Sequence, residues 1–190
     1  MSARRHHYER AFEAYLRARR IPYVSVDEAR KALIPNAPLF ADPTGEAGGS
    51  LKSFDFVVYG AEANLLVDIK GRKVQARRRD GTGRLESWVT EDDVASLRVW
   101  QRLFGEGFRA GFVFVYWCEE QPPDALFQEI IEHRGRWYAL RAVLLDDYAE
   151  RMTPRSRRWR TVHLPSAAFE RLSRPFCAAG SPRPEPVRVG

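Results

Sequence analysis

Cysteine, lysine and long apolar runs are all scarce in this chain of 190 residues. Its two cysteines, Cys118 and Cys177, lie far apart without a ligand-like spacing, which argues against a disulfide scaffold and against a zinc site. No apolar run is long enough to span a bilayer, and the first residues lead into a charged stretch instead of a signal-peptide core. We therefore expect a cytoplasmic protein with no membrane partner.

Only four of the 31 basic residues are lysines. Where a site needs positive charge alone, arginine serves as well, so a lysine kept beside a carboxylate indicates a role for a compact ammonium. Lys70 fits this description because it ends the triplet Asp68-Ile69-Lys70 in a segment typical of a buried strand. By chance alone, a chain of this composition would contain about 0.5 triplets of this kind. Its surroundings therefore have to support any role.

The overall composition predicts one folded domain with an anionic partner. Hydrophobic residues make up 44% and aromatic residues 12% of the chain, as in a globular protein. We expect a single domain over 1–176, with a core at about 6–118, an extension over 119–176 and a tail over 177–190. The net charge of +6 and isoelectric point of about 9.6 favour nucleic acid as the partner. The alternative is a protein that is rich in arginine throughout.

The spacing of apolar residues predicts the order of the secondary structure. A helix over 6–19 is followed by a short edge strand over 22–26, one or two helical turns over 27–33 and a loop over 35–50. The later predictions are strands over 54–59, 65–70 and 111–117, a helix from Thr90 to Gly105 with Asp93 completing a capping box, a hairpin of 127–131 with 137–144, a helix over 146–151, a strand over 162–164 and a helix capped by Ser166 that ends at Leu172.

The strands over 54–59 and 65–70 form a hairpin whose register can be argued. Burial of one face requires a four-residue loop at 60–63, since a slip by one residue exposes one set of apolar side chains. The buried set is Phe54, Phe56, Val58, Leu65, Val67 and Ile69. This register sets Asp55 directly opposite Asp68, where like charges destabilise a sheet unless they are neutralised. With Lys70 on the same face, the hairpin predicts a cation site. An ordinary ion pair of Asp55 with a nearby lysine is the alternative.

This order of elements resembles the PD-(D/E)xK nuclease superfamily, which includes archaeal Holliday-junction resolvases. The resemblance covers Tyr8 to about Trp117 and implies an α/β fold (α+β mixed sheet) with a restriction-endonuclease-like αβββαβ core and a C-terminal extension. Phe54 stands where the superfamily has the proline of its name. The opening His7-Tyr8-Glu9-Arg10-Ala11-Phe12-Glu13 is also similar to the signature of an uncharacterised bacterial family named HYExAFE.

The resemblance implies a role for each residue of the motif. Asp55 corresponds to the first acid, Asp68 to the second and Lys70 to the lysine. A glutamate of the first helix often completes the metal shell, and Glu9 is the candidate here, with Glu13 one turn away as the alternative. These residues would make the protein a metal-dependent endonuclease. A module of the same fold that binds nucleic acid or protein without cutting is the second hypothesis, and an unrelated α/β protein is the third.

Mg²⁺ or Mn²⁺ is the cofactor that this chemistry implies. Glu9, Asp55, Asp68 and the carbonyl of Ile69 would hold one or two ions, because Mg²⁺ binds a few carboxylates and keeps several waters. Such an ion activates a water and stabilises charge on a phosphate. Lys70 would orient or deprotonate that water, or neutralise the developing charge, and we expect burial to shift its pKa toward neutrality.

Two basic segments suggest how DNA, which we favour over RNA, would be held. The first follows the motif directly and comprises Arg72, Lys73, Arg77, Arg78 and Arg79. Arg157, Arg158 and Arg160 form the second, in which Trp159 could stack on a base. The alternative for each segment is a solvated charged loop. Gln101 is a further candidate as a polar group near the metal, and a homodimer is expected because many relatives cut both strands as pairs.

Overall fold

The structure, a computed structural model, describes residues 6–26, 51–74, 85–121 and 129–176. The predicted helical turns over 27–33, the loop over 35–50, the arginines at 77–79 and the tail lie outside these residues. The helices and strands are α1 (His6–Ala18), β1 (Tyr23–Ser25), β2 (Phe56–Val58), β3 (Asn64–Lys73), β4 (Val89–Thr90), α3 (Glu91–Phe104), β5 (Phe108–Cys118), β6 (Ile130–His133), β7 (Arg136–Leu144), α4 (Leu145–Arg151), β8 (Thr153–Ser156), β9 (Thr161–His163) and α5 (Ser166–Leu172).

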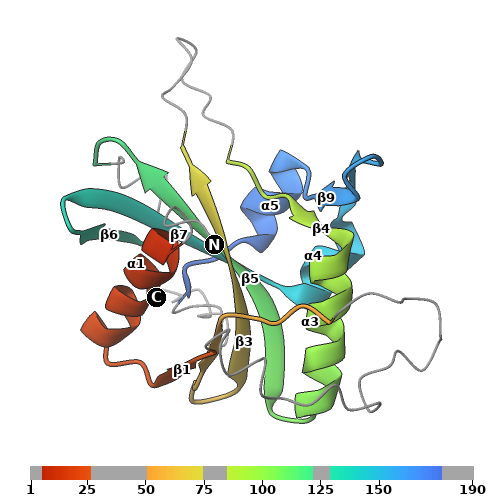
Figure 1. The fold of residues 1–190 in the computed structure, drawn as a ribbon, viewed down its shortest axis with the longest axis horizontal. Coiled ribbons are helices and arrows are strands. Elements are labelled where there is room, and N and C mark those ends of the chain that lie inside the picture. The colour runs from red at the N-terminus through yellow and green to blue at the C-terminus, as the bar shows by residue number, and fades with distance from the viewer. Residues whose placement is uncertain (1–5, 27–50, 75–84, 122–128, 177–190) are drawn as a thin grey trace, which may run out of the picture.

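A six-stranded mixed sheet with strand order β1-β2-β3-β5-β7-β6 forms the centre of the fold. Only β3 and β5 pair in parallel, and the other neighbours in this sheet are antiparallel. Helices α1 and α3 lie on opposite sides of β3 and β5 (Figure 1). A smaller sheet of order β4-β9-β8 lies beside the start of α3. The predicted mixed α/β class and the order α1, β1, β2, β3, α3, β5 are confirmed, with the short β4 inserted before α3.

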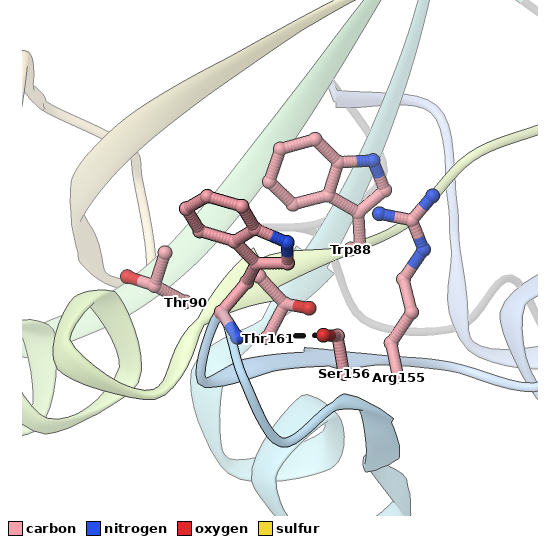
Figure 2. Close-up of a pocket in the computed structure, with 6 residues that line it drawn as sticks. Trp88, Thr90, Arg155, Ser156 and Thr161 are labelled. Atoms are coloured by element: carbon pink, nitrogen blue, oxygen red, sulfur yellow. Dashed lines mark hydrogen bonds between the residues drawn. The ribbon is translucent and has the colours of Figure 1, made fainter.

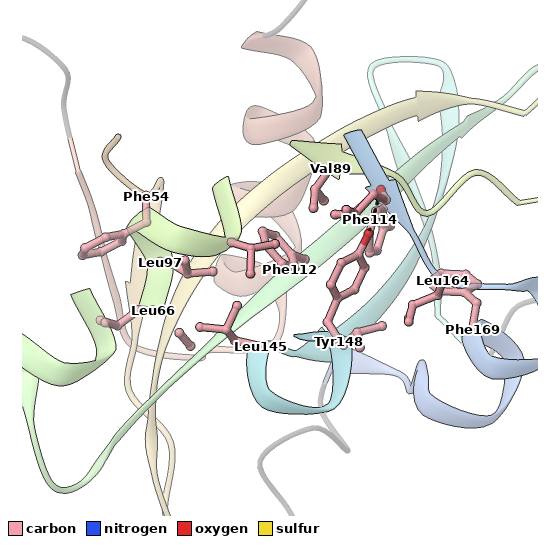
Figure 3. Close-up of a cluster of buried hydrophobic side chains, with 14 of the residues drawn as sticks. Phe54, Leu66, Val89, Leu97, Phe112, Phe114, Leu145, Tyr148, Leu164 and Phe169 are labelled. Atoms are coloured by element: carbon pink, nitrogen blue, oxygen red, sulfur yellow. Dashed lines mark hydrogen bonds between the residues drawn. The ribbon is translucent and has the colours of Figure 1, made fainter. Parts of the chain in front are cut away.

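Both faces of the central sheet are buried, and β3 contributes to both cores by alternation. Leu65 and Val67 pack toward α1, whereas Leu66 packs toward α3. Strand β5 is buried on both sides, as its continuous apolar sequence predicts. The core on the α3 side extends through α4 and α5 (Figure 3). The hairpin therefore has two buried faces, not the single one that its alternation suggested.

The predicted hairpin register is confirmed. Phe56 pairs with Val67 and Val58 pairs with Leu65, so one further step places Asp55 opposite Asp68. Strand β2 begins only at Phe56, however, and the chain bends before it.

The prediction that Phe54 shares a face with Phe56 is wrong because Phe54 precedes the strand. Its ring is buried on the α3 side, with ring centroids 5.5 Å from Trp100 and 5.8 Å from Phe104. Phe54 thus anchors α3 against the sheet at the position where the superfamily has its proline.

Local turn and cap signals predicted some element ends well and others less well. Arg134 and Gly135 have φ angles of 54° and 71°, which suit the tight turn between β6 and β7. Ser166 is not a cap, because α5 begins at Ser166 itself and Pro165 occupies the cap position. The β8–β9 hairpin was not predicted, since its arginines concealed the strand pattern. No helix within the described ranges is both long and apolar enough to cross a membrane.

Gly71 allows the start of α1 to lie against β3. A Cβ atom at this position would lie 2.2 Å from Cδ2 of Tyr8, so the ring would have to move. We expect Gly71→Ala to lower the free energy of unfolding by about 1 to 3 kcal/mol. In a protein that already carries Tyr8→Ala, the same change at Gly71 should cost much less, because the ring is gone. Urea denaturation of the parent and the three variants measures the coupling. Effects that simply add would contradict the steric explanation.

Candidate active site

Three of the residues predicted from sequence converge where β2 begins beside β3. The Lys70 Nζ atom lies 2.9 Å from Oδ2 of Asp68, and the side chains of these two residues are 15% and 13% exposed. Oδ2 of Asp55 accepts a hydrogen bond from the backbone N–H of Ile69 at 2.6 Å. The bend before β2 thus turns the Asp55 carboxylate toward β3, next to the residue that separates Asp68 from Lys70.

Lys70 lies between two carboxylates. Its Nζ atom is 3.0 Å from Oδ2 of Asp93, in addition to the contact with Asp68. Burial by itself lowers the pKa of the Lys70 ammonium, but the two carboxylates outweigh burial, so the pKa lies above its ordinary value. The expectation that this pKa shifts toward neutrality is therefore wrong. The raised pKa favours the charged ammonium form of Lys70.

Asp68 has an environment that disfavours its charged form. Burial is the main cause that raises the pKa of its carboxyl, to about 7, and the nearby Asp55 and Asp93 raise it further, while Lys70 opposes them. Lys70 alone thus does not offset the combined effect of burial and of the two neighbouring carboxylates on Asp68. A carboxylate in this condition gains from a bound cation, which supports a metal site at this position.

Asp93 is the residue of this cluster that sequence reasoning assigned only to the helix cap. The capping box is confirmed, since the Thr90 hydroxyl accepts from the Asp93 N–H at 3.1 Å and Oδ2 of Asp93 accepts from the Thr90 N–H at 2.9 Å. Oδ1 of Asp93 also accepts from Lys52 Nζ at 2.9 Å. Burial raises the pKa of Asp93, but Lys70, Thr90 and Lys52 together hold it well below its usual range.

The oxygen atoms near Asp68 suit a hard cation that keeps much of its water. In an extended strand the N–H and C=O of one residue point the same way. The N–H of Ile69 points toward Asp55, to which it donates, so the carbonyl of Ile69 points toward Asp55 as well. Two carboxylates and a carbonyl match Mg²⁺, which commonly takes one or two carboxylates plus waters and substrate phosphate. Within the described part of the chain, no group of three His, Cys, Asp or Glu side chains is placed to hold a metal ion.

The two glutamates of α1 differ in their surroundings. Glu13 accepts from Arg17 at 2.7 Å and from the Tyr23 hydroxyl at 2.8 Å, which ties it to its own helix and to β1. Glu9 lies in the first turn of α1 and is partly buried. Helix α1 packs on the opposite face of the sheet from Lys70. The role of Glu9 as a metal ligand therefore stays a prediction, for a residue whose helix packs on the face opposite Lys70.

Gln101 does not serve the site in this structure. Its Oε1 atom accepts from the backbone N–H of Ala110 at 2.7 Å, and its amide nitrogen lies 3.4 Å from both carboxylate oxygens of Asp146. Ala110 pairs with Leu66, which places it nearer the hairpin turn than Asp68. Gln101 thus connects α3 to β5 and α4, and the sequence expectation for it is wrong.

The basic residues differ in how far they are available for an anionic ligand. Lys73, on β3 and not in the loop that we expected, is about half exposed and pairs with Glu119 at 2.5 Å. Arg160 pairs with Glu91 and Asp92, each at 3.2 Å. Arg157 and Arg158, between β8 and β9, are exposed.

Arg72 points inward instead of into solvent. Its guanidinium donates to the carbonyl oxygens of Gly71 and Trp88, and its Cζ atom lies 4.0 Å from the centre of the Trp88 ring. Burial lowers the pKa of Arg72, against the opposing effects of Tyr116 and Glu86. The Arg72 guanidinium therefore packs against the Trp88 ring. A phosphate could contact Arg72 only while its hydrogen bonds to the two carbonyl groups are kept.

Comparisons with known proteins add a structural similarity. No family model matches this sequence, and no curated protein matches it. Among solved structures, the chain is similar to Hjc, a Holliday junction resolvase from the archaeal hyperthermophile Archaeoglobus fulgidus, with 13% sequence identity and a TM-score of 0.49. The match covers 92% of this chain and 98% of that chain. The expected relation to the HYExAFE family is not confirmed by these comparisons.

Proposed function

We propose that the protein is a divalent-metal-dependent phosphodiesterase that cuts DNA at the cluster of Asp55, Asp68 and Lys70. The observation that carries this proposal is the pairing of a fixed lysine with a buried carboxylate that still lacks positive charge. Carboxylates with a raised pKa are common where a protein binds a cation or performs chemistry.

Each residue then has a defined task. Asp55, Asp68 and the Ile69 carbonyl would hold Mg²⁺ or Mn²⁺, with Glu9 as a further ligand. The bound ion would supply Lewis-acid stabilisation and an activated water. Lys70, which stays protonated, would stabilise negative charge on the phosphate and would not remove a proton.

Solvent-facing basic residues would position the DNA backbone by its charge. From the two basic segments predicted from sequence, they include Lys73 on β3 and Arg157 and Arg158 between β8 and β9. Arg77, Arg78 and Arg79 remain part of the proposal, although they lie outside the described residues. Arg160 would act mainly through its ion pairs, which hold the turn that carries Arg157 and Arg158. Contacts of this kind position a strand without reading its sequence.

A DNA cleavage assay tests the proposal. Supercoiled plasmid, linear duplex, four-way junction and single-stranded DNA are incubated with the protein in Mg²⁺, in Mn²⁺ and in EDTA. We expect strand cleavage with either metal and none in EDTA, because the bound ion would supply the activated water. Gel electrophoresis measures the products, and Asp68→Asn protein purified in the same way excludes a contaminating nuclease.

A binding module without catalysis is the second candidate. The observation that favours it is that the described residues do not assemble three carboxylates around one point. Tight DNA binding with no cleavage in Mg²⁺ or Mn²⁺ would support this module and contradict the enzyme. Neither binding nor cleavage on any of the four DNA substrates would contradict both.

A further inference from the structure

The small sheet carries a pocket of about 590 Å³ (Figure 2). It is lined by Trp88, Thr90, Arg155, Ser156, Trp159 and Thr161. Strands β4, β8 and β9 of the small sheet contribute most of these residues. The volume falls in the range of pockets that bind small organic molecules.

The pocket and the site share a wall. Thr90 lines the pocket, and its hydroxyl accepts hydrogen bonds from Lys52 Nζ at 2.9 Å and from the N–H of Asp93, which in turn holds Lys70. On β3, Arg72 lies two residues beyond Lys70 and packs against Trp88. Thr90 and Asp93 therefore connect the pocket to Lys70.

Trp88 offers a fixed aromatic surface. The guanidinium of Arg72 lies 4.0 Å from the centre of its ring. That of Arg155, which Figure 2 draws beside Trp88, lies 5.0 Å from the same centre. The Arg72 guanidinium also binds the backbone carbonyl of Trp88, which restrains the indole further. Glu86 accepts from Trp88 Nε1 at 3.2 Å and pairs with Arg155 at 3.5 Å, so two arginines and one carboxylate hold this indole in place.

Trp159 is exposed but held in place. Trp159 is 68% accessible, which is the largest value among the exposed large hydrophobic residues of the described chain. Its backbone N–H donates to Ser156 Oγ at 3.3 Å, and the ion pairs of Arg160 with Glu91 and Asp92 fasten the turn to α3. The guanidinium of Arg158 lies 5.3 Å from the Trp159 ring. These contacts hold the backbone of the turn, and the indole that it carries is open to a flat ligand.

We infer that this pocket holds an unpaired nucleobase of the DNA strand whose phosphate lies at the Asp68 and Lys70 site. The inference rests on the proposed function and specifies its substrate as DNA with unpaired nucleotides, such as single strands, gaps, tails or branch points. Aromatic stacking accepts any base, and the surrounding arginines match the charge of the backbone. A base inside an intact duplex is stacked and would first have to be flipped out.

A binding experiment in EDTA separates this pocket from catalysis. Fluorescence anisotropy measures the affinity of labelled single-stranded and blunt duplex DNA for the parent, Trp159→Ala and Trp159→Phe. We expect Trp159→Ala to bind single strands about 10-fold more weakly or worse, because stacking on an aromatic ring contributes strongly for each base. Blunt duplex binding should change by less than about twofold, because its bases do not enter the pocket. Trp159→Phe should retain most of the single-strand affinity.

The control is Tyr59→Ala, which removes another exposed aromatic residue, 43% accessible and next to the turn between β2 and β3. Its affinities should equal those of the parent, and thermal denaturation verifies that each variant folds. Unchanged single-strand affinity in Trp159→Ala, or an equal loss on duplex, overturns the inference whether or not the protein cuts DNA. Binding to single strands that depends on Trp159, without cleavage in Mg²⁺, would support the pocket and contradict the proposed enzyme.

Discussion

Asp68→Asn is expected to lose DNA cleavage while the protein remains as stable as the parent or becomes more stable. Asparagine has nearly the same shape but cannot supply the negative charge that would hold a cation. Removal of one electrostatic group from an active site typically lowers the rate by about 100-fold to 1,000-fold, and loss of a metal ligand should lie at the upper end or beyond. Cleavage of the preferred DNA substrate under single-turnover conditions measures this loss.

The stability of Asp68→Asn follows from the charges around Lys70. Removal of one partner from a buried ion pair usually destabilises, because a charge is left alone. Lys70 keeps Asp93 at 3.0 Å, so its ammonium stays paired in the variant. The variant also removes a buried carboxylate that lies near Asp55 and Asp93. We expect the free energy of unfolding in EDTA at about pH 8 to rise by about 0 to 2 kcal/mol.

The same variant has a predicted pH dependence. The pKa of Asp68 is about 7 in the folded protein, above the value of about 4 for an unfolded chain. The folded protein therefore binds this proton more tightly, and the stabilisation is complete below about pH 4 and lost as the pH rises through about 7. Asparagine does not titrate, so the stability of Asp68→Asn relative to the parent should increase between about pH 5 and 8.

Thermal denaturation in EDTA across this pH range checks the sign. Glu106→Gln is the matched control, because Glu106 is an exposed acid between α3 and β5. A variant at Asp68 that is less stable than the parent at every pH would mean that Asp68 serves as a structural partner of Lys70.

Local patterns predicted the parts of the fold that short stretches of sequence determine. The hairpin register follows from the loop length between two alternating segments, and it correctly places Asp55 opposite Asp68. The start of α3 follows from a capping box that needs only Thr90 and Asp93. In both cases the interacting residues lie close together in the sequence, so their spacing carries the geometry.

The rest depended on contacts between distant segments, which spacing does not contain. Phe54 lies one residue before the bend that precedes β2, and alternation gave no sign that it would turn toward α3. The role of Asp93 as a partner of Lys52 and Lys70 requires that three separate segments meet. For the same reason, the pairing of Arg72 with Trp88 and the pocket next to it could not be predicted from a run of basic residues.

Asp93→Ala is expected to cause the largest loss of stability among the variants of this site. The change removes the acceptor for the Thr90 N–H and the shared partner of Lys52 and Lys70. Loss of a helix cap lowers stability by about 0.5 to 2 kcal/mol, and hydrogen bonds to charged groups add about 1.5 to 3 kcal/mol. We expect a total near 3 kcal/mol, which corresponds to a melting temperature lower by about 6 to 12 °C for a chain of this size.

Asp92→Ala is the matched control, since Asp92 is the preceding residue, is 51% exposed and pairs only with a surface arginine among the described contacts. Its loss should stay below about 1 kcal/mol. Asp93→Asn separates the two contributions, because the amide oxygen can still cap Thr90 whereas the charge that holds Lys70 is gone. If Asp93→Asn is as stable as the parent, capping explains the whole effect and Asp93 does not fix the Lys70 ammonium. If it is nearly as unstable as Asp93→Ala, the two lysines dominate, and the raised pKa of Lys70 depends on this carboxylate as well as on Asp68.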